Sequence, residues 1–435
     1  MGILLKNGYI VTQNEQREQF QGDILVEGNR IQAIAPSISE EGHSIVDLSG
    51  LVVVPGLIQT HVHLCQTLFR NLADDLELLD WLEQRIWPFE MAHNPDSLRI
   101  SARLGLAELL LGGTTTIQDM GNGKFQDIIF QEMKRSGIRG FSGKVMMDQG
   151  NQPYKEPTET VLSETEELIR KWHGQEENRI QYALAPRFVP SCSMDLWKGV
   201  KELSDKYHLI IHTHASENRK EWQLVKDTTG YSNIEFFVKN DLVSSRLNLA
   251  HCIWVSEEEI QMMSEYSINV LHCPSANLKL GSGIAPIPRY WEQGIHVGLG
   301  ADGAPCNNNL DIFVEMRLAA LIQKPQRGVK STNAQQIFDM ATIEGARVLG
   351  LEDEIGSIEV GKKADLTILD LNKVHAIPAD NIYSQIVYSA HASDVKHVLI
   401  DGKWVVFNRE LQNDNYSEIV QTAWSEVQKL FKRIE

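Results

Sequence analysis

Between about residues 51 and 351 the chain alternates short apolar segments of strand character with segments of helical periodicity. Eight strand-like segments, each followed by a helix or by a loop and a helix, predict an α/β fold, a TIM-type (β/α)8 barrel. A doubly wound open sheet is the alternative, and it is disfavoured because no Gly-x-Gly-x-x-Gly motif follows the first segment. The eight segments are LVVVPGLIQ, TTTIQDM, GIRGFSGKVMM, RIQYALAPRF, HLIIHTHAS, LNLAHCIWV, INVLHCPSA and IHVGLGADG.

Strand-like pieces with turn signals also occur toward both ends of the chain. They run from Ile3 to Leu51, and a similar texture returns in GSIEVGKKADLTILDL and VKHVLIDGKWVVFNREL. A chain of 435 residues also exceeds the size at which a single core usually stops growing. We therefore predict a small β-sandwich domain built from residues 1–54 and 353–415, a barrel over 55–352, and a C-terminal helix over 416–435.

Composition restricts the class of partner and the compartment. A formal charge of −17 without clusters of Lys and Arg argues against nucleic acid, so a small-molecule partner is expected. Neither a secretory signal nor a membrane-spanning run is recognisable, which predicts a cytoplasmic protein without membrane contact. The cysteines are odd in number and widely spread, which disfavours a disulfide framework. They are Cys65, Cys192, Cys252, Cys273 and Cys306.

Two histidines, His61 and His63, follow the apolar run Leu51–Ile58. In an extended chain, side chains two residues apart point to the same face and can converge on one point. Neutral imidazole is a common ligand of zinc and iron, so the pair is a candidate metal site. The alternative is that two histidines lie near a strand end by chance and only pack or face solvent.

Further polar side chains recur at the ends of other predicted strands. Because barrel active sites lie at the C-terminal ends of the strands, these residues are expected to come together. A single histidine at a strand end often only binds a backbone carbonyl, but the joint recurrence favours a metal site. The residues are His212, His214 and Glu217 after the fifth strand, His251 after the sixth, His272 after the seventh and Asp302 after the eighth.

The motifs around these residues resemble a known family. They are PGLIQTHVHL, HTHASEN, AHC, HCPSANLKLGSGIAPIP and GADGAPCNNNLDIF. Together they are similar to the amidohydrolase superfamily, in the branch of aminohydrolases and chlorohydrolases that includes methylthioadenosine/S-adenosylhomocysteine deaminase, guanine deaminase and triazine hydrolases. The resemblance covers nearly the whole chain. It implies a metal-dependent hydrolase barrel, the split β domain, and possible assembly into a homo-oligomer.

The resemblance also implies a set of metal ligands. Carried over by motif, His61, His63, His214 and Asp302 would bind one divalent ion, with zinc expected and iron or manganese as alternatives. Members with two metals bridge them with a carboxylated lysine after the fourth strand, and RIQYALAPRF has no lysine. We therefore expect a single ion, with no metal role for Lys144 and a structural one for His212.

Three of these residues are implied to be catalytic. Asp302 would accept a proton from the attacking water, His251 would hydrogen-bond that water, and Glu217 would protonate the ring nitrogen beside the carbon under attack. The alternative for Glu217 is a helix N-terminal carboxylate that the helix dipole stabilises.

The segment DDLELLDWLEQRIWPFE resembles the lid over the ring-binding site in this branch. Within it, Glu90 matches a glutamate that binds ribose hydroxyls in nucleoside enzymes, and Trp81 and Trp87 could stack on a ring or simply pack. Arg187 departs from the adenosine-type motif, which has Pro-His-x-Pro, and with SEN at 216–218 is closer to guanine deaminase. The predicted substrate-binding residues are Glu90, Trp87, Arg187 and His214.

These motifs predict an enzyme that releases ammonia from C6 of a 5'-modified adenosine, because GADGAPCNNNLDIF and SGIAPIP are closer to the adenosine-type deaminases. Candidate substrates are 5'-deoxyadenosine, methylthioadenosine and S-adenosylhomocysteine. The alternatives are guanine deamination at C2 and hydrolysis of an amino- or chloro-triazine. A non-catalytic barrel is a remote alternative, because it would require a ligand or Glu217 to be missing.

Overall fold

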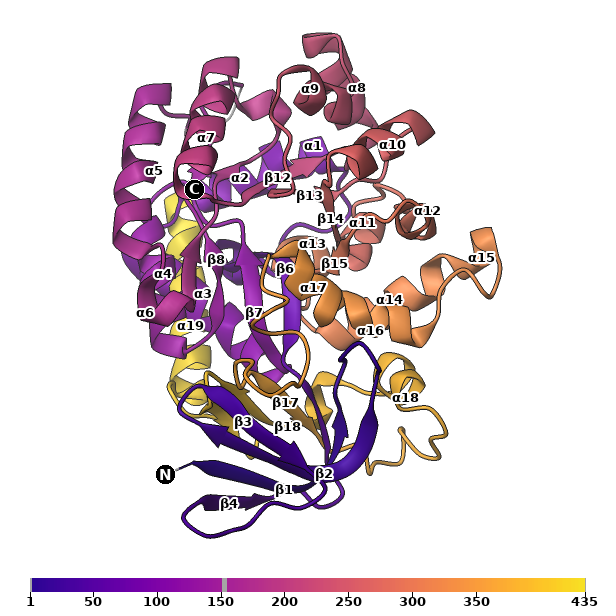
Figure 1. The fold of residues 1–435 in the computed structure, drawn as a ribbon. Helices are drawn as coiled ribbons and strands as arrows, with labels where there is room; N and C mark the ends of the chain where they lie inside the picture. Colours follow the sequence, from indigo (N-terminus) through magenta and orange to yellow (C-terminus); the bar gives the residue numbers. More distant parts are fainter. Residues whose placement is uncertain (1, 151–154, 435) are drawn as a thin grey trace.

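The computed structural model describes residues 2–150 and 155–434 and consists of a barrel with a β domain beneath it (Figure 1). Eight consecutive strand positions, all paired in parallel, form the barrel, and helices lie outside them. This confirms the predicted α/β class. The principal strands are β6 (Leu57–His63), β7 (Thr114–Asp119), β8 (Arg139–Ser142), β10 (Ile180–Tyr182), β12 (Ile211–Ala215), β13 (Leu247–His251), β14 (Asn269–His272) and β15 (Val297–Leu299).

Three short strands extend the barrel at its C-terminal rim. They are β9 (Val145–Met146), β11 (Ala185–Pro186) and β16 (Asp302–Gly303). The barrel closes because β16 pairs with β6, and because the bridge between Leu184 and Ile211 joins its two halves. Asp302 is thereby placed beside the end of β6, where its backbone pairs with that of Val62.

The first apolar run is predicted as one barrel strand, with the boundary between the β domain and the barrel at residues 54 and 55. In the structure it forms two strands, β5 (Val52–Pro55) in the β domain and β6 in the barrel, which meet at Gly56. A Cβ atom at position 56 would lie 2.1 Å from Oγ1 of Thr115, so only glycine fits where the chain passes between the two sheets. Strand β6, which carries His61 and His63, is therefore anchored in the β domain immediately before it begins.

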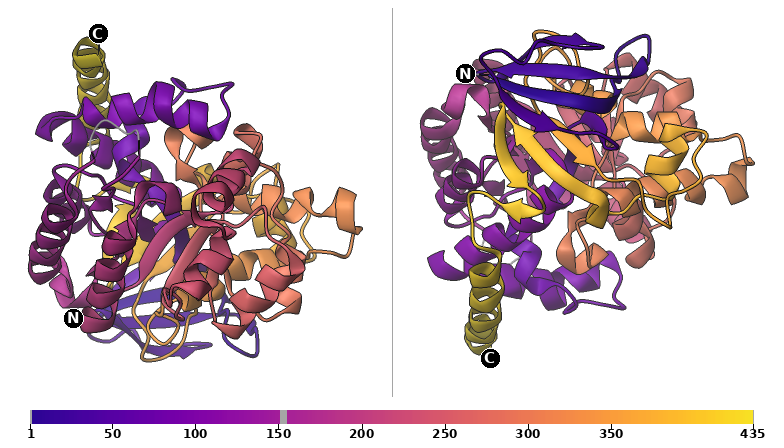
Figure 2. Two further views of the ribbon diagram at one scale, coloured as in Figure 1. Left: turned by 90° about the horizontal axis from the view of Figure 1, so that it is seen from above. Right: turned by 90° about the horizontal axis from the view of Figure 1, so that it is seen from below.

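Strands from both ends of the chain form one sheet, as the sequence predicted. Its order is β20-β19-β18-β17-β5-β1-β2-β3, and β4 pairs with β1 (Figure 2). Hydrophobic side chains from both ends share its core. The remaining strands are β1 (Ile3–Val11), β2 (Gln19–Glu27), β3 (Arg30–Ala35), β4 (Ser44–Asp47), β17 (Leu366–Leu369), β18 (Val395–Ile400), β19 (Lys403–Phe407) and β20 (Glu410–Leu411).

A buried cation joins the barrel to the β domain. Arg139, the first residue of β8, donates hydrogen bonds to both carboxylate oxygens of Asp365, at 2.7 and 3.1 Å, and to Asp401 at 2.6 Å. All three side chains are largely buried. A bidentate guanidinium contact of this kind fixes direction as well as distance, so it orients the sheet relative to the barrel.

The helices that cover the barrel are amphipathic, and several begin with a capping side chain, for example Ser256 at α10. Among the described residues no helix is long and apolar enough to cross a membrane. The main helices are α3 (Pro95–Leu111), α4 (Gln126–Ser136), α5 (Thr158–Trp172), α7 (Met194–Tyr207), α8 (Arg219–Thr229), α9 (Asn233–Lys239), α10 (Glu257–Glu265), α11 (Pro274–Lys279), α12 (Ile287–Glu292), α14 (Ile312–Ile322), α16 (Ala334–Met340), α17 (Ile343–Val348) and α18 (Ile382–Tyr388).

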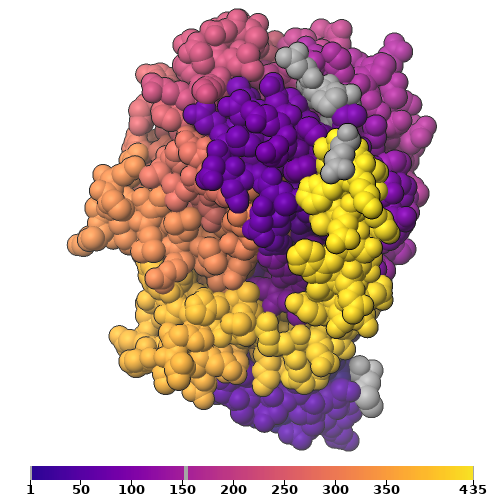
Figure 3. Space-filling view, turned by 180° about the vertical axis from the view of Figure 1, so that it is seen from behind, coloured from indigo at the N-terminus to yellow at the C-terminus, as the bar shows by residue number. Residues whose placement is uncertain are grey.

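The C-terminal helix α19 (Tyr416–Ile434) returns along the outside of the barrel (Figure 3). Its apolar face, with Ile419 and Leu430, packs against α3 and against Phe89 in α2 (Trp87–Met91). Arg433 also donates a hydrogen bond to the carbonyl of Ala92 at 2.6 Å. The end of the chain thus supports the segment that covers the candidate site.

Candidate active site

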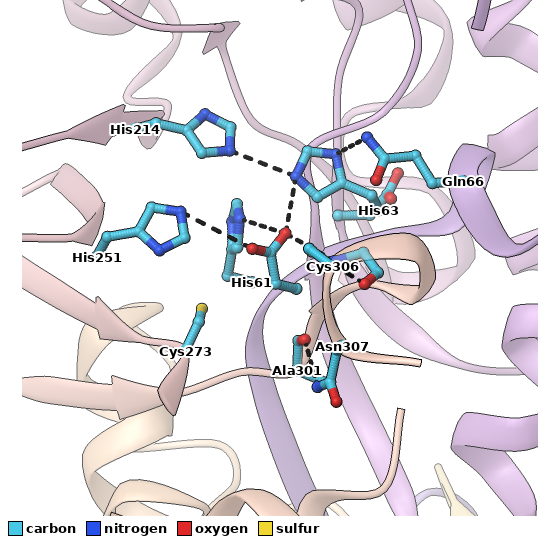
Figure 4. A network of polar contacts seen from close by, with 12 residues as sticks. His61, His63, Gln66, His214, His251, Cys273, Ala301, Cys306 and Asn307 are labelled. Carbon is cyan, nitrogen blue, oxygen red and sulfur yellow. Dashed lines mark hydrogen bonds and ion pairs between the residues drawn. The ribbon is translucent and has the colours of Figure 1, made fainter. Parts of the chain in front are cut away.

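Three predicted metal ligands, His61, His63 and His214, converge at the C-terminal rim of the barrel, with ligand atoms within 4.8 Å of one another (Figure 4). His61 forms a second group of this kind with His251 and Asp302. Oδ1 of Asp302 lies 3.4 Å from Nε2 of His61 and 3.3 Å from Nε2 of His63, and Nε2 of His214 lies 3.4 Å from Nε2 of His63. Zinc–nitrogen bonds of 2.0–2.1 Å in a tetrahedron place neighbouring ligand atoms about 3.4 Å apart. The observed spacings therefore suit one divalent ion.

The hydrogen bonds of the histidine rings also suit a metal. In each ring Nδ1 faces a protein partner: the carbonyl of Arg187 for His214 at 2.7 Å, Oδ1 of Asn277 for His251 at 2.8 Å, and Nε2 of His212 for His61 at 2.7 Å. Among the described residues the buried Nε2 atoms of His61 and His251 have no hydrogen-bond partner. Unpaired buried nitrogens that point at a carboxylate are typical of residues that bind a cation.

Burial and charge set the ligands in the protonation states that a metal needs. Burial lowers the pKa of His63 to about 3, so its imidazole is neutral at pH 7. Burial alone would raise the pKa of Asp302, but the close contact with His61 and the neighbouring histidines keep that pKa well below its usual value. Asp302 and His251 also have left-handed backbones, with φ of 64° and 76°, a strained conformation that is common at functional sites.

Glu217 lies in the same cavity, immediately after β12. Its Oε2 lies 3.5 Å from Nε2 of His251, and the side chain is 4% exposed. Burial, and then the charge of Asp302, raise the pKa of Glu217 well above its usual value, which favours the protonated acid. Helix α8 is capped by Asn218, which accepts a hydrogen bond from the backbone of Lys220. The side chain of Glu217 therefore lines the site, and another residue caps the helix.

Glu221, one turn further, supports this position. It accepts a hydrogen bond from the backbone N–H of Glu217 at 3.2 Å and another from the side chain of Asn233 at 3.0 Å. Burial raises the pKa of Glu221 to about 8. Because this pKa lies above 7, Glu221 is mostly protonated at neutral pH and places no negative charge beside Glu217.

Glu90 and Arg187 form an ion pair on another wall of the cavity. Nη1 of Arg187 lies 2.7 Å from Oε2 of Glu90, and Gln66 donates a hydrogen bond to Oε1 at 2.9 Å. Both charged side chains are 3% exposed. The cavity between this pair and the histidines is also lined by Trp81, Leu78 and Leu82 from the lid segment.

The other predicted residues lie as follows. Trp87 is buried and lines a neighbouring cavity beyond the lid, so its contact with substrate stays a prediction. Lys144 lies away from the metal ligands, where its ammonium group binds Gly123, Glu156 and Glu164. His272 is buried at the end of β14, and its two ring nitrogens have no hydrogen-bond partner in the described part of the chain.

Sequence reasoning did not single out three residues that support the site. Gln66 lies one turn after His63 in the short helix η1 (Leu64–Phe69), and Asn277 lies in α11 just after the seventh strand. Asp119, at the end of β7, is buried and accepts hydrogen bonds from Leu64 at 2.8 Å and from a serine hydroxyl at 2.6 Å. Of these three residues, Asp119 could have been found from the sequence, because it is a carboxylate at the end of the predicted strand TTTIQDM.

Comparison with known proteins agrees with this geometry. Residues 52–405 match the Amidohydrolase family. The chain is 36% identical over 412 residues to 5-methylthioadenosine/S-adenosylhomocysteine deaminase of Thermococcus onnurineus, covering 94% of this chain and 95% of the relative. It is 37% identical over 394 residues to 5'-deoxyadenosine deaminase of Methanothermobacter thermautotrophicus, covering 90% and 91%.

A solved structure with the same fold is that of an adenosine deaminase from Xanthomonas campestris with bound zinc. The two folds superpose with a TM-score of 0.92 at 30% sequence identity, over 99% of this chain and 98% of the other. Fold, site geometry and sequence similarity over nearly the full length therefore lead to the same assignment. The chain belongs to the amidohydrolase family.

Proposed function

We propose that the protein is a metal-dependent deaminase that releases ammonia from C6 of a 5'-modified adenosine such as 5'-deoxyadenosine, methylthioadenosine or S-adenosylhomocysteine. The observation that carries this proposal is the convergence of His61, His63 and His214, with Asp302 beside His61 and His63 and the buried acid Glu217 nearby. Similarity over more than 90% of their length to relatives named for these substrates supports the substrate class.

The proposed metal ligands are His61, His63, His214 and Asp302, and the proposed cofactor is a single divalent ion, with zinc expected because the Xanthomonas structure contains bound zinc. A divalent cation held by such a set lowers the pKa of water and so supplies a nucleophile near neutral pH. Lys144, the lysine expected to have no metal role, is bound elsewhere, which supports a site for one ion.

Each proton transfer in the proposed reaction is assigned to a side chain around this point. Asp302 is ionised and accepts the proton of the attacking water, while His251 hydrogen-bonds that water and is itself held by Asn277. Glu217, protonated because it is buried, donates its proton to the ring nitrogen next to C6 and so relieves the charge that develops on the ring. Proton return through Asp302 then lets ammonia leave.

The opposite wall of the cavity selects the substrate. We assign Glu90 to the ribose hydroxyls and Trp81 to one face of the base, because Trp81 lines the cavity and Glu90, on the same lid segment, binds the cavity-lining Arg187. Arg187 holds Glu90 in place and presents N–H groups to an acceptor on the substrate. Trp87 and His214 complete the proposed substrate contacts.

Guanine deamination is the second candidate, and a specific observation favours it. Arg187 and the amide of Gln66 place two donor groups on the same carboxylate, and such donors also suit the carbonyl oxygen of an oxopurine. In that reaction Glu217 would protonate a ring nitrogen next to C2, with the same metal ligands.

Ammonia release from a substrate panel separates the candidates. The metal-loaded enzyme is assayed with 5'-deoxyadenosine, methylthioadenosine, S-adenosylhomocysteine, adenosine, guanine and an aminotriazine. The proposal expects the highest kcat/KM for a 5'-modified adenosine. Turnover of guanine with no turnover of any adenosine would instead establish the second candidate. His61→Ala is the control, and it is expected to lose both bound metal and ammonia release.

A further inference from the structure

We propose that His212 is a positioning residue that holds His61 in the orientation and tautomer that a metal ligand needs. The inference rests on the proposed metal centre. Nε2 of His212 lies 2.7 Å from Nδ1 of His61, and both side chains are 0% exposed. The two rings are nearly perpendicular, with an interplanar angle of 88°. The contact is therefore made edge-on through the ring nitrogens.

The direction of this hydrogen bond follows from the chemistry of the ligand. Nε2 of His61 faces Asp302 at 3.4 Å and can bind a cation only through its lone pair, so that nitrogen must carry no proton. A neutral His61 then carries its proton on Nδ1 and donates it to Nε2 of His212. The reverse hydrogen bond would leave the proton of His61 on Nε2, where it would exclude the cation. Metal binding therefore needs His212 as an acceptor.

The strand that holds His212 also links two of the proposed metal ligands, His214 and His61. His212 and His214 are two residues apart on β12, so both side chains point into the barrel. The backbone N–H of His212 donates to the carbonyl of Leu184 at 2.8 Å, which fixes its place on the strand. One strand thus supplies a ligand, His214, and the group that orients another ligand, His61, from the opposite side of the barrel.

A neutral acceptor has a different effect from a charged one. A carboxylate at this position would increase the electron donation of His61 and reduce the net positive charge of the centre. The acceptors beside the rings of His214 and His251 are also uncharged, a backbone carbonyl and an amide. Asp302 is then the one anionic ligand in the proposed set, which keeps the bound cation electron-poor and suited to acidifying water.

The test compares His212→Phe with His212→Gln. Phe fills the space but accepts no hydrogen bond, whereas the carbonyl oxygen of Gln can accept one from His61. The readouts are the apparent Zn²⁺ dissociation constant, measured by chelator competition, and the visible absorption spectrum of the Co²⁺-loaded protein. We expect His212→Phe to weaken Zn²⁺ binding by about 10- to 100-fold and to change the spectrum. His212→Gln is expected to stay within about threefold of the parent protein.

His397→Phe is the matched control. His397 is 4% exposed in β18, its ring accepts a hydrogen bond from the backbone of Asn408 at 3.1 Å, and it packs on Trp404 and Phe407 outside the barrel. Its replacement removes a buried imidazole acceptor in the same chain. We expect unchanged Zn²⁺ affinity and an unchanged Co²⁺ spectrum for this variant.

Two outcomes would overturn the inference. One is parental Zn²⁺ affinity and Co²⁺ spectrum in His212→Phe; the other is an equal loss of affinity in His212→Gln, which would indicate a packing role. If His212→Phe does not fold, His212→Asn replaces it, because the shorter amide does not reach His61. Failure of the proposed function has a different signature, namely a parent protein that binds zinc but deaminates no purine.

Discussion

Nη1 of Arg187 lies 2.7 Å from Oε2 of Glu90, and both side chains are buried to 97% within the wall of the active-site cavity. The two residues are 97 positions apart in the sequence, one on the lid segment and one after β11. Two charges that leave water together must be closely paired, since desolvation otherwise outweighs their attraction. The pair therefore attaches the lid to the barrel rim beside the cavity where we propose that the substrate binds.

Arg187→Met should disturb both stability and catalysis. Removing the cation leaves the carboxylate of Glu90 buried beside Gln66, so we expect a loss of about 3–5 kcal/mol in the free energy of unfolding. We also expect kcat/KM to fall by roughly tenfold or more, since a substrate-facing donor is lost. Urea unfolding and steady-state ammonia release measure the two effects. Arg187→Lys, which keeps the charge without the bidentate geometry, should lose less stability; equal losses would contradict the ion-pair argument.

Glu217→Gln should separate catalysis from metal binding. Gln has the same size but carries no acidic proton, so we expect kcat to fall by about 10²- to 10⁴-fold. Zinc content, measured by elemental analysis, should stay at the parental value because the ligands are untouched. Glu167→Gln, on the exposed face of α5, is the control and should not affect kcat. Parental turnover in Glu217→Gln would remove the proposed acid.

Arg139→Met tests the junction between the barrel and the β domain. Asp365 and Asp401 would lose their shared cation while they stay buried, so we expect the free energy of unfolding to fall by about 3–5 kcal/mol. The exposed pair between Arg170 and Glu166 is the comparison, and Arg170→Ala should cost under about 1 kcal/mol. Chemical denaturation followed by circular dichroism gives both values, and similar losses would argue against a structural role for the junction.

Glu315→Gln should change how stability depends on pH. The side chain is 0% exposed and accepts hydrogen bonds from Asn307 at 2.8 Å and from the backbone of Ser275 at 3.1 Å. Burial raises its pKa to about 7, so the folded protein binds the proton more tightly than the unfolded chain. The resulting stabilisation is complete below the unfolded pKa of about 4.3 and is lost as the pH rises through 7.

Between pH 4 and pH 8 the free energy of unfolding of the parent protein should therefore fall by about 3 kcal/mol relative to that of Glu315→Gln. Each pKa unit corresponds to about 1.4 kcal/mol. Urea unfolding of both proteins across this range measures the difference. A constant difference between them would show that Glu315 has the same pKa in the folded and unfolded chains.

Much of the barrel could be predicted because its strands carry local signals. Apolar runs such as LNLAHCIWV mark β13, and His251 at its end is visible in the same run. The sequence placed the domain boundary inside the first run, at residues 54 and 55, but did not predict two separate strands, because an apolar segment has the same appearance in either sheet. The close approach of Gly56 to Thr115 shows that one sheet gives way to the other at this residue.

The candidate site, like the fold, could be predicted only in part from the sequence. The resemblance of the motifs to the family predicted His61, His63, His214 and Asp302 as metal ligands, and histidine and carboxylate side chains at strand ends are residue types that such sites use. The ion pair between Glu90 and Arg187 could not be found in this way, since nothing in either local sequence specifies a partner 97 residues away. Trp81 and Trp87 are alike in sequence, and only packing places Trp81 on the site cavity.

The sequence alone determined the alternation of strands and helices, the polar residues at the strand ends, and the family. The alternation and the strand-end residues depend on periodicity over short windows, and the family depends on motifs, all of which the chain carries wherever it folds. The tertiary structure decided which nitrogen of each histidine faces the proposed metal site, through partners such as His212 for His61 and Asn277 for His251. Ring orientation depends on hydrogen bonds between distant strands, and those exist only once the barrel has closed.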